Sequence, residues 1–241
     1  MRRPAPAAGG ADAGTGGEGA GLVGIWAQRE ITVAWNDVPI LGESRTENRV
    51  LVRIAISPEA PEEAHIETCA IEIRGAPDAA TQTVVPDAFV RAVEVQSRPV
   101  QVDPDGRFSG GRLVEIDGAR LDRPSEDALP TTADDPRVTD PDADGHPGLT
   151  VRITGLVDGE VYVVQRRITT LTGTQEGDRL HGRIEWAAEQ NILGADNPAL
   201  THPIPSRPDP DPALDVFDAQ RVSKDRDCAW IRAHAEALFG D

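Results

Sequence analysis

The sequence predicts an all-β protein, an antiparallel β-barrel or barrel-like sandwich with a short C-terminal helix. Three observations predict this class. From residue 22 onward, apolar residues recur with a period of two, as in the segment RVLVRIAI. Turn pairs such as Asp105-Gly106, Asp158-Gly159 and Gly177-Asp178 separate these segments. A clear helical period occurs only near the C-terminus. Many short alternating segments joined by tight turns are typical of a sheet closed on itself.

Each alternating segment has one apolar face, which we expect to be buried. Residues 149–192 predict a three-strand meander. The residues that share an apolar face are Ile31, Val33 and Trp35 in EITVAW, Val50, Val52, Ile54 and Ile56 in RVLVRIAI, Cys69, Ile71 and Ile73 in TCAIEI, and Leu180, Ile184 and Trp186 in RLHGRIEW. This pattern predicts that Cys69 points into the core. Branched aliphatic side chains of this size fill a small barrel, so we expect a packed interior without a ligand-sized lumen.

Helical character is confined to two segments. Residues 86–93 are compatible with a single turn, and the segment CAWIRAHAEALF places Ile231, Ala235 and Leu238 on one apolar stripe. Residues 194–215, in contrast, are rich in proline, which has no amide hydrogen for a ladder hydrogen bond. We expect this stretch to wrap the surface as extended coil.

The length of 241 residues and the apolar content of 39% are sufficient for one domain with a core. We expect a tether at 1–21 and a single β domain at 22–241 that contains a long acidic loop at 118–148. The Gly/Ala/Pro-rich tether resembles the spacer that follows the lipid-bearing cysteine of bacterial lipoproteins, although neither that cysteine nor an apolar signal region is present. The resemblance implies an exported bacterial protein, periplasmic or extracellular. A cytoplasmic protein with a disordered tail is the alternative.

The net charge of -17 argues against nucleic-acid binding, because Lys and Arg contacts to phosphate carry that affinity. It also disfavours an anionic membrane surface. No run of 18 apolar residues occurs, so we expect no transmembrane segment. Cys69 and Cys228 are too far apart for a redox pair or a local zinc cluster. They form either a long-range disulfide or two buried thiols.

The tripeptide Gly24-Ile25-Trp26 resembles the Gly-x-Trp opening of lipocalin-type barrels. The resemblance covers the first strand only. It implies a barrel that carries a small apolar ligand and a disulfide that ties the C-terminal segment to a strand, for which Cys69 and Cys228 are the candidates. The chain lacks the family's Thr-Asp-Tyr stretch and is longer than a typical member.

The stretch TDPDADGHPG places Asp140, Asp142 and Asp144 at alternate positions and follows them with a glycine that permits a sharp turn. Hard oxygen ligands of this kind select Ca²⁺. The pattern resembles the first half of an EF-hand loop, in which His146 would offer its backbone carbonyl. Val151 stands where that loop has a bidentate glutamate, so the resemblance is closer to the calcium loops of thrombospondin-type and dockerin-like repeats.

Calcium loops of that second kind recruit ligands from elsewhere, and Asp134 and Asp135 are the first candidates here. A cation that neutralises clustered carboxylates would also explain an ordered connection as long as 118–148. The alternative is a solvated acidic loop in which the Asp-Gly pair is only a turn.

The sequence contains no Gly-x-Ser-x-Gly elbow, His-Glu-x-x-His motif or glycine-rich phosphate loop. His181 and His234 are expected on the surface of a strand and a helix. We therefore expect a calcium-binding protein with a binding or structural role and no catalytic residues. Its partner would be a protein at the cell surface, and a small-molecule ligand is not expected. A hydrolase that uses carboxylates near the acidic loop is the alternative.

Overall fold

The computed structural model describes residues 21–38, 42–76, 79–202 and 204–240. Apart from Gly21, the expected N-terminal tether lies outside these residues. The strands are β1 (Gly24–Val38), β2 (Gly42–Ser57), β3 (Ala60–Gly75), β4 (Thr81–Val84), β5 (Gln96–Val102), β6 (Arg107–Asp117), β7 (Leu149–Gly155), β8 (Gly159–Glu176), β9 (Arg179–Ala195), β10 (Ser206–Pro208) and β11 (Val216–Val222). The helices are α1 (Asp87–Ala92), α2 (Cys228–Phe239) and the short 3-10 helices η1 (Pro198–Leu200) and η2 (Pro212–Leu214).

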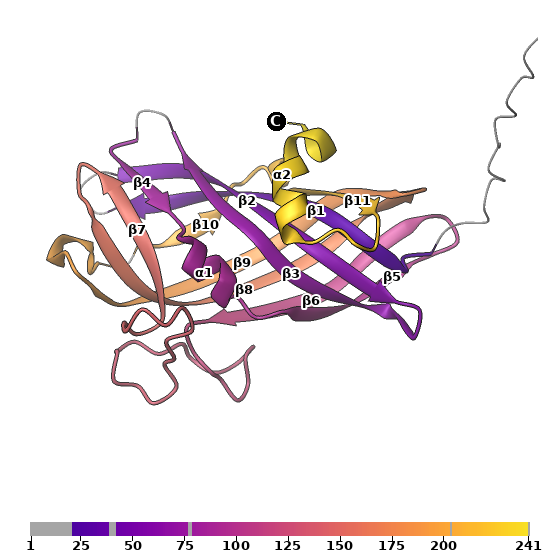
Figure 1. The fold of residues 1–241 in the computed structure, drawn as a ribbon. Coiled ribbons are helices and arrows are strands. Elements are labelled where there is room, and N and C mark those ends of the chain that lie inside the picture. Colours follow the sequence, from indigo (N-terminus) through magenta and orange to yellow (C-terminus); the bar gives the residue numbers. More distant parts are fainter. Residues whose placement is uncertain (1–20, 39–41, 77–78, 203, 241) are drawn as a thin grey trace, which may run out of the picture.

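Eight of the described strands form a closed antiparallel ring (Figure 1). Its order is β8-β6-β5-β3-β2-β1-β11-β9, and β9 pairs back to β8. The ring closes because β8 is long: one edge pairs with β9, while the other pairs first with β7 and then with β6. The predicted antiparallel all-β class with a short C-terminal helix is confirmed.

Turns and strand order also follow the sequence pattern. Gly106 and Gly177 adopt φ angles of 81° and 62°, which a tight hairpin turn requires and which glycine adopts without strain. β7, β8 and β9 follow one another as antiparallel neighbours, so the predicted three-strand meander is confirmed. The single helical turn expected at 86–93 is α1.

An apolar core fills one end of the ring. The four predicted residues of β2 are all buried there, together with Trp26 of β1. Ile71 and Trp186 are half-buried and pack against this core. The core members are Leu22, Trp26, Val50, Val52, Ile54, Ile56, Ala64, Ile66, Val100, Phe108, Leu113, Leu171, Leu180, Ile184, Phe217 and Ala219. A cavity of about 10 Å³ lies among them, which is about the size of one water molecule.

A second apolar cluster lies beside β7 and β4, which continue the sheet from β8 outside the eight-stranded ring. Phe89 of α1 packs there against Leu149, Val161 and Val163. The short helix α1 contacts both β3 and β7. It therefore covers the region in which these two strands are not hydrogen-bonded to each other.

The inner face of β1 is not the face with the apolar alternation. Trp26 and Gln28 line the interior, because they pair with Ile54 and Val52 of β2 and cross-strand partners point to the same side. Side chains alternate between the two faces of a strand, and Ile31, Val33 and Trp35 are an odd number of residues from Trp26 and Gln28. They therefore lie on the outer face. The inner face of β1 carries the polar residues Gln28 and Glu30, so its residues are not uniformly apolar. A search for apolar alternation therefore identified the opposite face.

Cys69 is buried as predicted, but it does not point into the ring interior or share the inner face of Ile71, so that part of the prediction is wrong. Thr68 pairs with Val52, and Ala70 pairs with Leu51, which leaves Cys69 as the extra residue of a β-bulge. The bulge shifts the alternation by one residue. Cys69 is buried instead on the outer face, in a cluster with Ala27 and Ile231.

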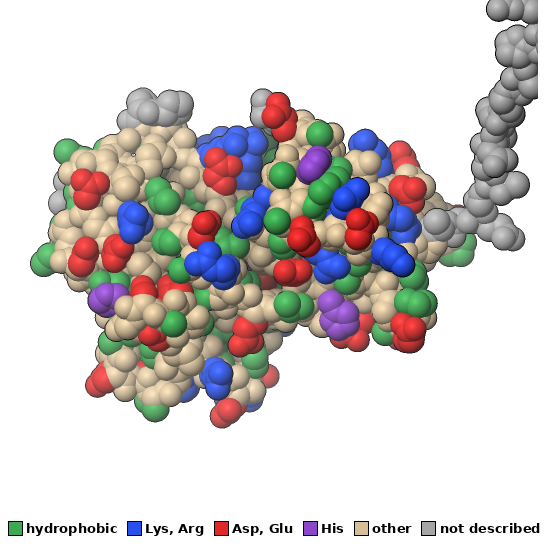
Figure 2. Space-filling model, in the orientation of Figure 1, with side chains coloured by type: hydrophobic (Ala, Val, Ile, Leu, Met, Phe, Trp, Pro, Cys, Tyr) green, Lys and Arg blue, Asp and Glu red, His purple; other side chains and the backbone are tan. Residues whose placement is uncertain are grey.

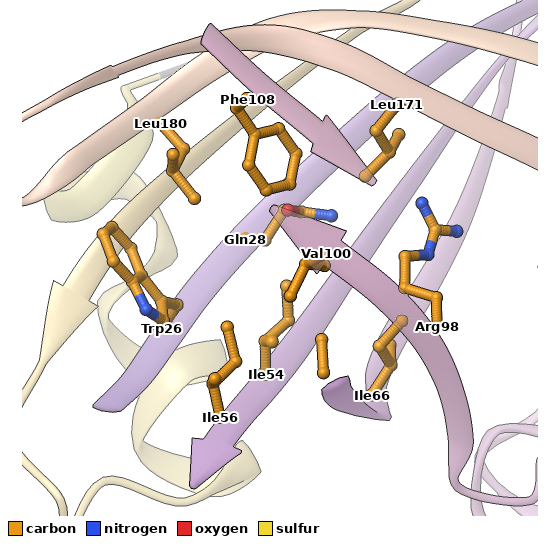
Figure 3. Close-up of a pocket in the computed structure, with 11 residues that line it drawn as sticks. Trp26, Gln28, Ile54, Ile56, Ile66, Arg98, Val100, Phe108, Leu171 and Leu180 are labelled. Carbon is orange, nitrogen blue, oxygen red and sulfur yellow. The ribbon is translucent and has the colours of Figure 1, made fainter. Parts of the chain in front are cut away.

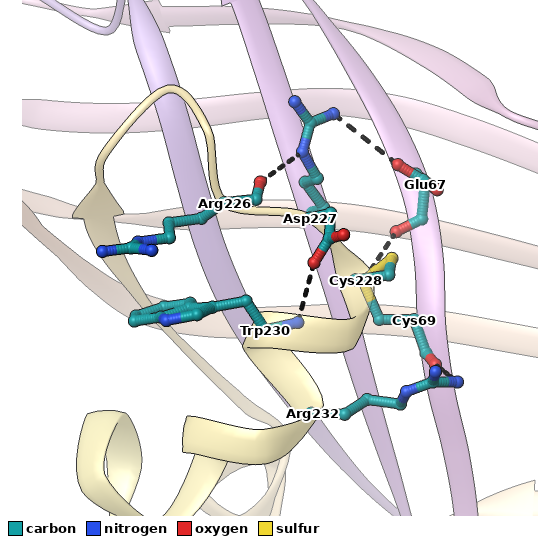
Figure 4. The surroundings of a disulfide bond; sticks show 8 residues. Glu67, Cys69, Arg226, Asp227, Cys228, Trp230 and Arg232 are labelled. Atoms are coloured by element: carbon teal, nitrogen blue, oxygen red, sulfur yellow. Dashed lines mark hydrogen bonds and ion pairs between the residues drawn. A yellow bond between two sulfur atoms is a disulfide. The ribbon is translucent and has the colours of Figure 1, made fainter.

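Cys69 forms a disulfide with Cys228, the first residue of α2 (Figure 4). The helix lies along the outer face of β2 and β3. Asp227 caps it by accepting a hydrogen bond from the Trp230 amide at 2.8 Å. Ile231 of the predicted apolar stripe is fully buried against the wall.

The proline-rich stretch 194–215 is not extended coil throughout. β9 continues to Ala195, and β10 forms ladder pairs with β1, including Trp35 with Arg207 and Asn36 with Ser206. A short strand tolerates proline when it lies at an edge, since one of its sides needs no ladder partner. Pro208, the last residue of β10, is placed accordingly.

Candidate metal site on the acidic loop

The acidic loop, residues 118–148, connects the end of β6 to the start of β7 and folds back on the outside of the ring (Figure 1). Ala119 and Leu129 of the loop bury apolar surface against Val164 of β8. In Figure 2 the loop protrudes from one side of the molecule and carries both acidic and arginine side chains on its surface. The loop is therefore docked on the wall, although it contains no regular strand or helix.

Two side chains of the wall hold the loop backbone. Arg166 of β8, which is buried, donates to the Pro124 carbonyl at 3.1 Å and to the Asp127 carbonyl at 2.9 Å. Asn191 of β9 donates to the Pro130 carbonyl at 3.0 Å. These bonds satisfy loop carbonyls that have no strand partner, which a docked irregular segment requires.

The Asp140–Asp144 turn folds around its own first carboxylate. The Asp144 amide donates to Asp140 Oδ1 at 3.2 Å, and the Gly145 amide donates to Asp140 Oδ2 at 3.0 Å. Ala143 and Gly145 have φ angles of 56° and 87°, so the chain turns through two left-handed residues. One ligand oxygen from each of Asp140, Asp142 and Asp144 lies within 4.8 Å of the others, so this triad could hold a metal ion.

Thr150 of β7 fixes the orientation of the other two carboxylates. Its amide donates to Asp142 Oδ2 at 3.0 Å, and its hydroxyl donates to Asp144 Oδ2. Asp142 Oδ1 is buried and has no hydrogen-bond partner in the described residues. Burial raises the pKa of Asp142, and the charge of Asp144 raises it further. Desolvated negative charge at this position favours a bound proton or a bound cation.

Asp134 and Asp135, proposed from the sequence as further ligands, do not join the triad within the described part of the chain. Asp135 is paired with Arg137, whose Nη2 lies 2.7 Å from Oδ2 and whose Nε lies 3.0 Å from Oδ1. The hydrogen bonds from Arg137 lower the pKa of Asp135 to about 2. Asp134 is exposed.

His146 lies beside the triad, with its ring stacked on Tyr162 of β8 at a centroid distance of 4.0 Å. The Tyr162 hydroxyl is 3.4 Å from His146 Nε2. Next in the loop, Gly148 (φ 86°) lies directly against the Val163 carbonyl and leaves no space for a Cβ atom. These contacts fix the C-terminal half of the turn on the ring wall.

Thr150 and Tyr162 were not found by sequence reasoning. Neither belongs to a spacing pattern with the aspartates, and both come to the loop from strands. The interior charged residues Glu30, Glu115 and Arg167 were also missed, because the sequence pattern marked apolar alternation only. Arg167 Nε lies 2.7 Å from Glu115 Oε2 in the ring interior.

We found no protein-family model, curated protein or solved structure that matches this chain. Among the described residues, neither α2 nor any other helix has the length and apolar character needed to cross a bilayer.

Proposed function

We propose that this protein binds one Ca²⁺ ion through Asp140, Asp142 and Asp144 and that it has a binding or structural role outside the cytoplasm. One observation carries the proposal. In the same loop, Asp127 and Asp135 are each neutralised by an arginine. The triad has no such ion pair among the described residues, although its carboxylates converge and Asp142 Oδ1 is buried.

The ligand chemistry supports Ca²⁺ above other ions. Carboxylate and carbonyl oxygens suit hard cations, and Ca²⁺ accepts six to eight of them in flexible geometry. The His146 carbonyl and water molecules would complete the shell. Because the loop lacks the bidentate glutamate of an EF-hand, we expect a weak site with a Kd of about 10⁻⁴ to 10⁻³ M, the range of extracellular calcium modules.

The disulfide supports the proposed location. A bridge between Cys69 and Cys228 forms and persists in the periplasm or outside the cell, whereas reducing cytoplasm disfavours it. Extracellular calcium is also concentrated enough to fill a weak site. A periplasmic or extracellular protein is therefore the assignment that agrees with both features.

The proposed role of the ion is to fix the acidic loop as a contact surface for a protein partner at the cell surface. Of the alternatives, a lipocalin-like carrier would need an interior pocket of about 300 Å³ or more. The cavity in the apolar core is about 10 Å³, which favours the binding or structural role over the carrier. A hydrolase would need one carboxyl group that donates a proton and one that accepts it. The carboxylates of the triad accept hydrogen bonds from backbone amides and Thr150, which favours metal binding over this alternative.

Terbium luminescence tests the site directly. Tb³⁺ replaces Ca²⁺ at oxygen sites, and Tyr162, the sole tyrosine of the chain, is stacked on His146 beside the triad. We expect Tb³⁺ emission on aromatic excitation, competition by millimolar Ca²⁺, and a large loss of emission in Tyr162→Phe without loss of Ca²⁺ binding by calorimetry.

Asp142→Asn should abolish both Tb³⁺ and Ca²⁺ binding. Asp122→Asn is the matched control, since Asp122 is an exposed aspartate of the same loop. The variants Asp134→Asn and Asp135→Asn decide whether these residues are ligands. If calorimetry finds no heat at millimolar Ca²⁺ and chelation leaves the Tm of the wild-type protein unchanged, the calcium proposal fails.

A further inference from the structure

A layer of polar side chains crosses the ring interior next to the apolar core. Arg167 of β8 pairs with Glu115 of β6 at 2.7 Å and lies 3.8 Å from Glu30 of β1. Gln28 donates from Nε2 to Glu30 Oε1 at 2.8 Å. The layer therefore links three strands of the ring through hydrogen bonds and ion pairs.

Arg98 of β5 is the incompletely paired member of this layer. Its side chain donates from Nη2 to Thr169 Oγ1 at 2.6 Å, but Nε and Nη1 have no partner in the described residues. The residue is only 3% exposed. Burial lowers the pKa of Arg98, and the charges of Glu30 and Glu115 oppose that effect. A buried N–H of a charged group without an acceptor is costly, so native proteins rarely leave one unpaired.

Within the part of the chain that the structure describes, Gln28 lacks a hydrogen-bond donor for its side-chain oxygen, whereas Arg98 lacks acceptors for Nε and Nη1. It is 1% exposed, and its Oε1 accepts no hydrogen bond in the described residues. Both side chains line the cavity of about 10 Å³ in the ring. Figure 3 shows the Gln28 amide in the middle of this space, the Arg98 guanidinium to one side, and Trp26, Phe108 and Leu171 among the surrounding side chains.

The size and charge of the cavity restrict its occupant. A volume of about 10 Å³ is close to one water-sized probe, so an organic ligand does not fit. The surrounding charges balance, since Arg98 and Arg167 face Glu30 and Glu115. A small anion would gain from Arg98 but would be repelled by the two carboxylates. A neutral molecule that both accepts and donates hydrogen bonds can pair with the unpaired N–H groups of Arg98 and with Gln28 Oε1.

We propose that this cavity is an internal hydration site that holds one water molecule, which accepts from Arg98 and donates to Gln28 Oε1. The water completes a continuous polar chain from Thr169 through Arg98, Gln28 and Glu30 to Arg167 and Glu115. The charged layer is then a filled and internally paired part of the ring. It is not an empty binding pocket for an unidentified ligand.

Water-oxygen magnetic relaxation dispersion tests the proposal by counting long-lived internal waters. Gln28→Leu removes the acceptor and should lower the count by about one water relative to the wild-type protein. Gln101→Leu is the matched control, because Gln101 lies exposed on β5, and it should leave the count unchanged. An equal count in the wild-type protein and Gln28→Leu overturns the proposal.

A high-resolution crystal structure of the wild-type protein decides the same question if Gln28→Leu does not fold. Density for one water within hydrogen-bond distance of both Arg98 and Gln28 Oε1 supports the proposal. An empty cavity overturns it. An anomalous bromide peak there, after a soak of the crystal in bromide, also overturns it and identifies an anion site.

Discussion

The C-terminal helix α2 and the acidic loop 118–148 both lie on the outer wall of the ring, but they are held there by different chemistry. α2 is attached by the Cys69–Cys228 disulfide and by the fully buried Ile231. The loop has a small apolar contact around Leu129, polar contacts to Arg166 and Asn191, and a carboxylate triad without a counter-charge in the described residues. The first attachment depends on oxidation of the two cysteines, and we propose that the second depends on a bound cation.

Removal of the disulfide should have the largest effect. Cys69 and Cys228 are separated by 159 residues, and the double variant Cys69→Ser/Cys228→Ser should lower the free energy of unfolding by about 2 to 5 kcal/mol. Denaturant titration in the presence and absence of Ca²⁺ measures it. We expect the calcium-induced increase in stability to persist in this variant. Its disappearance would show that the two attachments are coupled.

Truncation of one buried side chain in each attachment tests further whether α2 and the acidic loop are held independently. Ile231→Ala and Leu129→Ala each remove a buried side chain, and each should cost about 2 to 4 kcal/mol, with Leu129→Ala at the lower end because the loop can relax around the cavity. Only Leu129→Ala should weaken Ca²⁺ binding, since distant sites act independently. Equal losses of Ca²⁺ affinity by calorimetry would contradict this separation.

Thr150 provides a smaller and more specific test of the loop. Thr150→Val removes the hydroxyl that donates to Asp144 and keeps the amide that donates to Asp142. The loss of one hydrogen bond should weaken Ca²⁺ binding about 2- to 10-fold. Thr150→Ser restores the hydroxyl and should restore the affinity. If the valine variant binds Ca²⁺ as tightly as the serine variant, the Thr150 hydroxyl does not position the triad.

The smallest expected effect is a pH dependence confined to the loop. The pKa of Asp142 is raised by burial, so the folded state without metal binds a proton more readily than the unfolded state does. That state therefore gains stability as the pH falls from neutral toward the raised pKa. Protons compete with Ca²⁺, so the increase in Tm caused by Ca²⁺ should shrink over the same range.

Asp142→Asn serves as the control for the pH experiment, because it removes this titration from the metal-free protein. Melting curves at several pH values, with Ca²⁺ and with chelator, provide the measurement. An increase in Tm caused by Ca²⁺ that is unchanged as the pH falls would be inconsistent with a carboxylate site.

The aspartate triad of the candidate site is local in sequence and was predicted from it. The alternation of Asp140, Asp142 and Asp144 brings three carboxylates together because a tight turn needs no distant partner to form. The ion pair of Asp135 with Arg137 is equally local, but it was not predicted: Asp135 was expected to be a metal ligand, although a separation of two residues could have indicated the pair. Thr150 could not be identified in this way, since it reaches the triad only when β7 pairs with β8.

The sequence by itself determined the alternating strands, the tight turns and the terminal helix, because side-chain period and glycine backbone freedom act over a few residues. It did not reveal β10, which forms only by pairing with β1. Tertiary structure alone decided which face of β1 is inside and to which side Cys69 of β3 points, whereas the inner face of β2 was predicted from its alternation. The bulge in β3 turns Cys69 outward to meet Cys228, and the pairing of β1 with β2 turns Gln28 into the ring. Both outcomes depend on register between strands, which a period of two along one strand cannot specify.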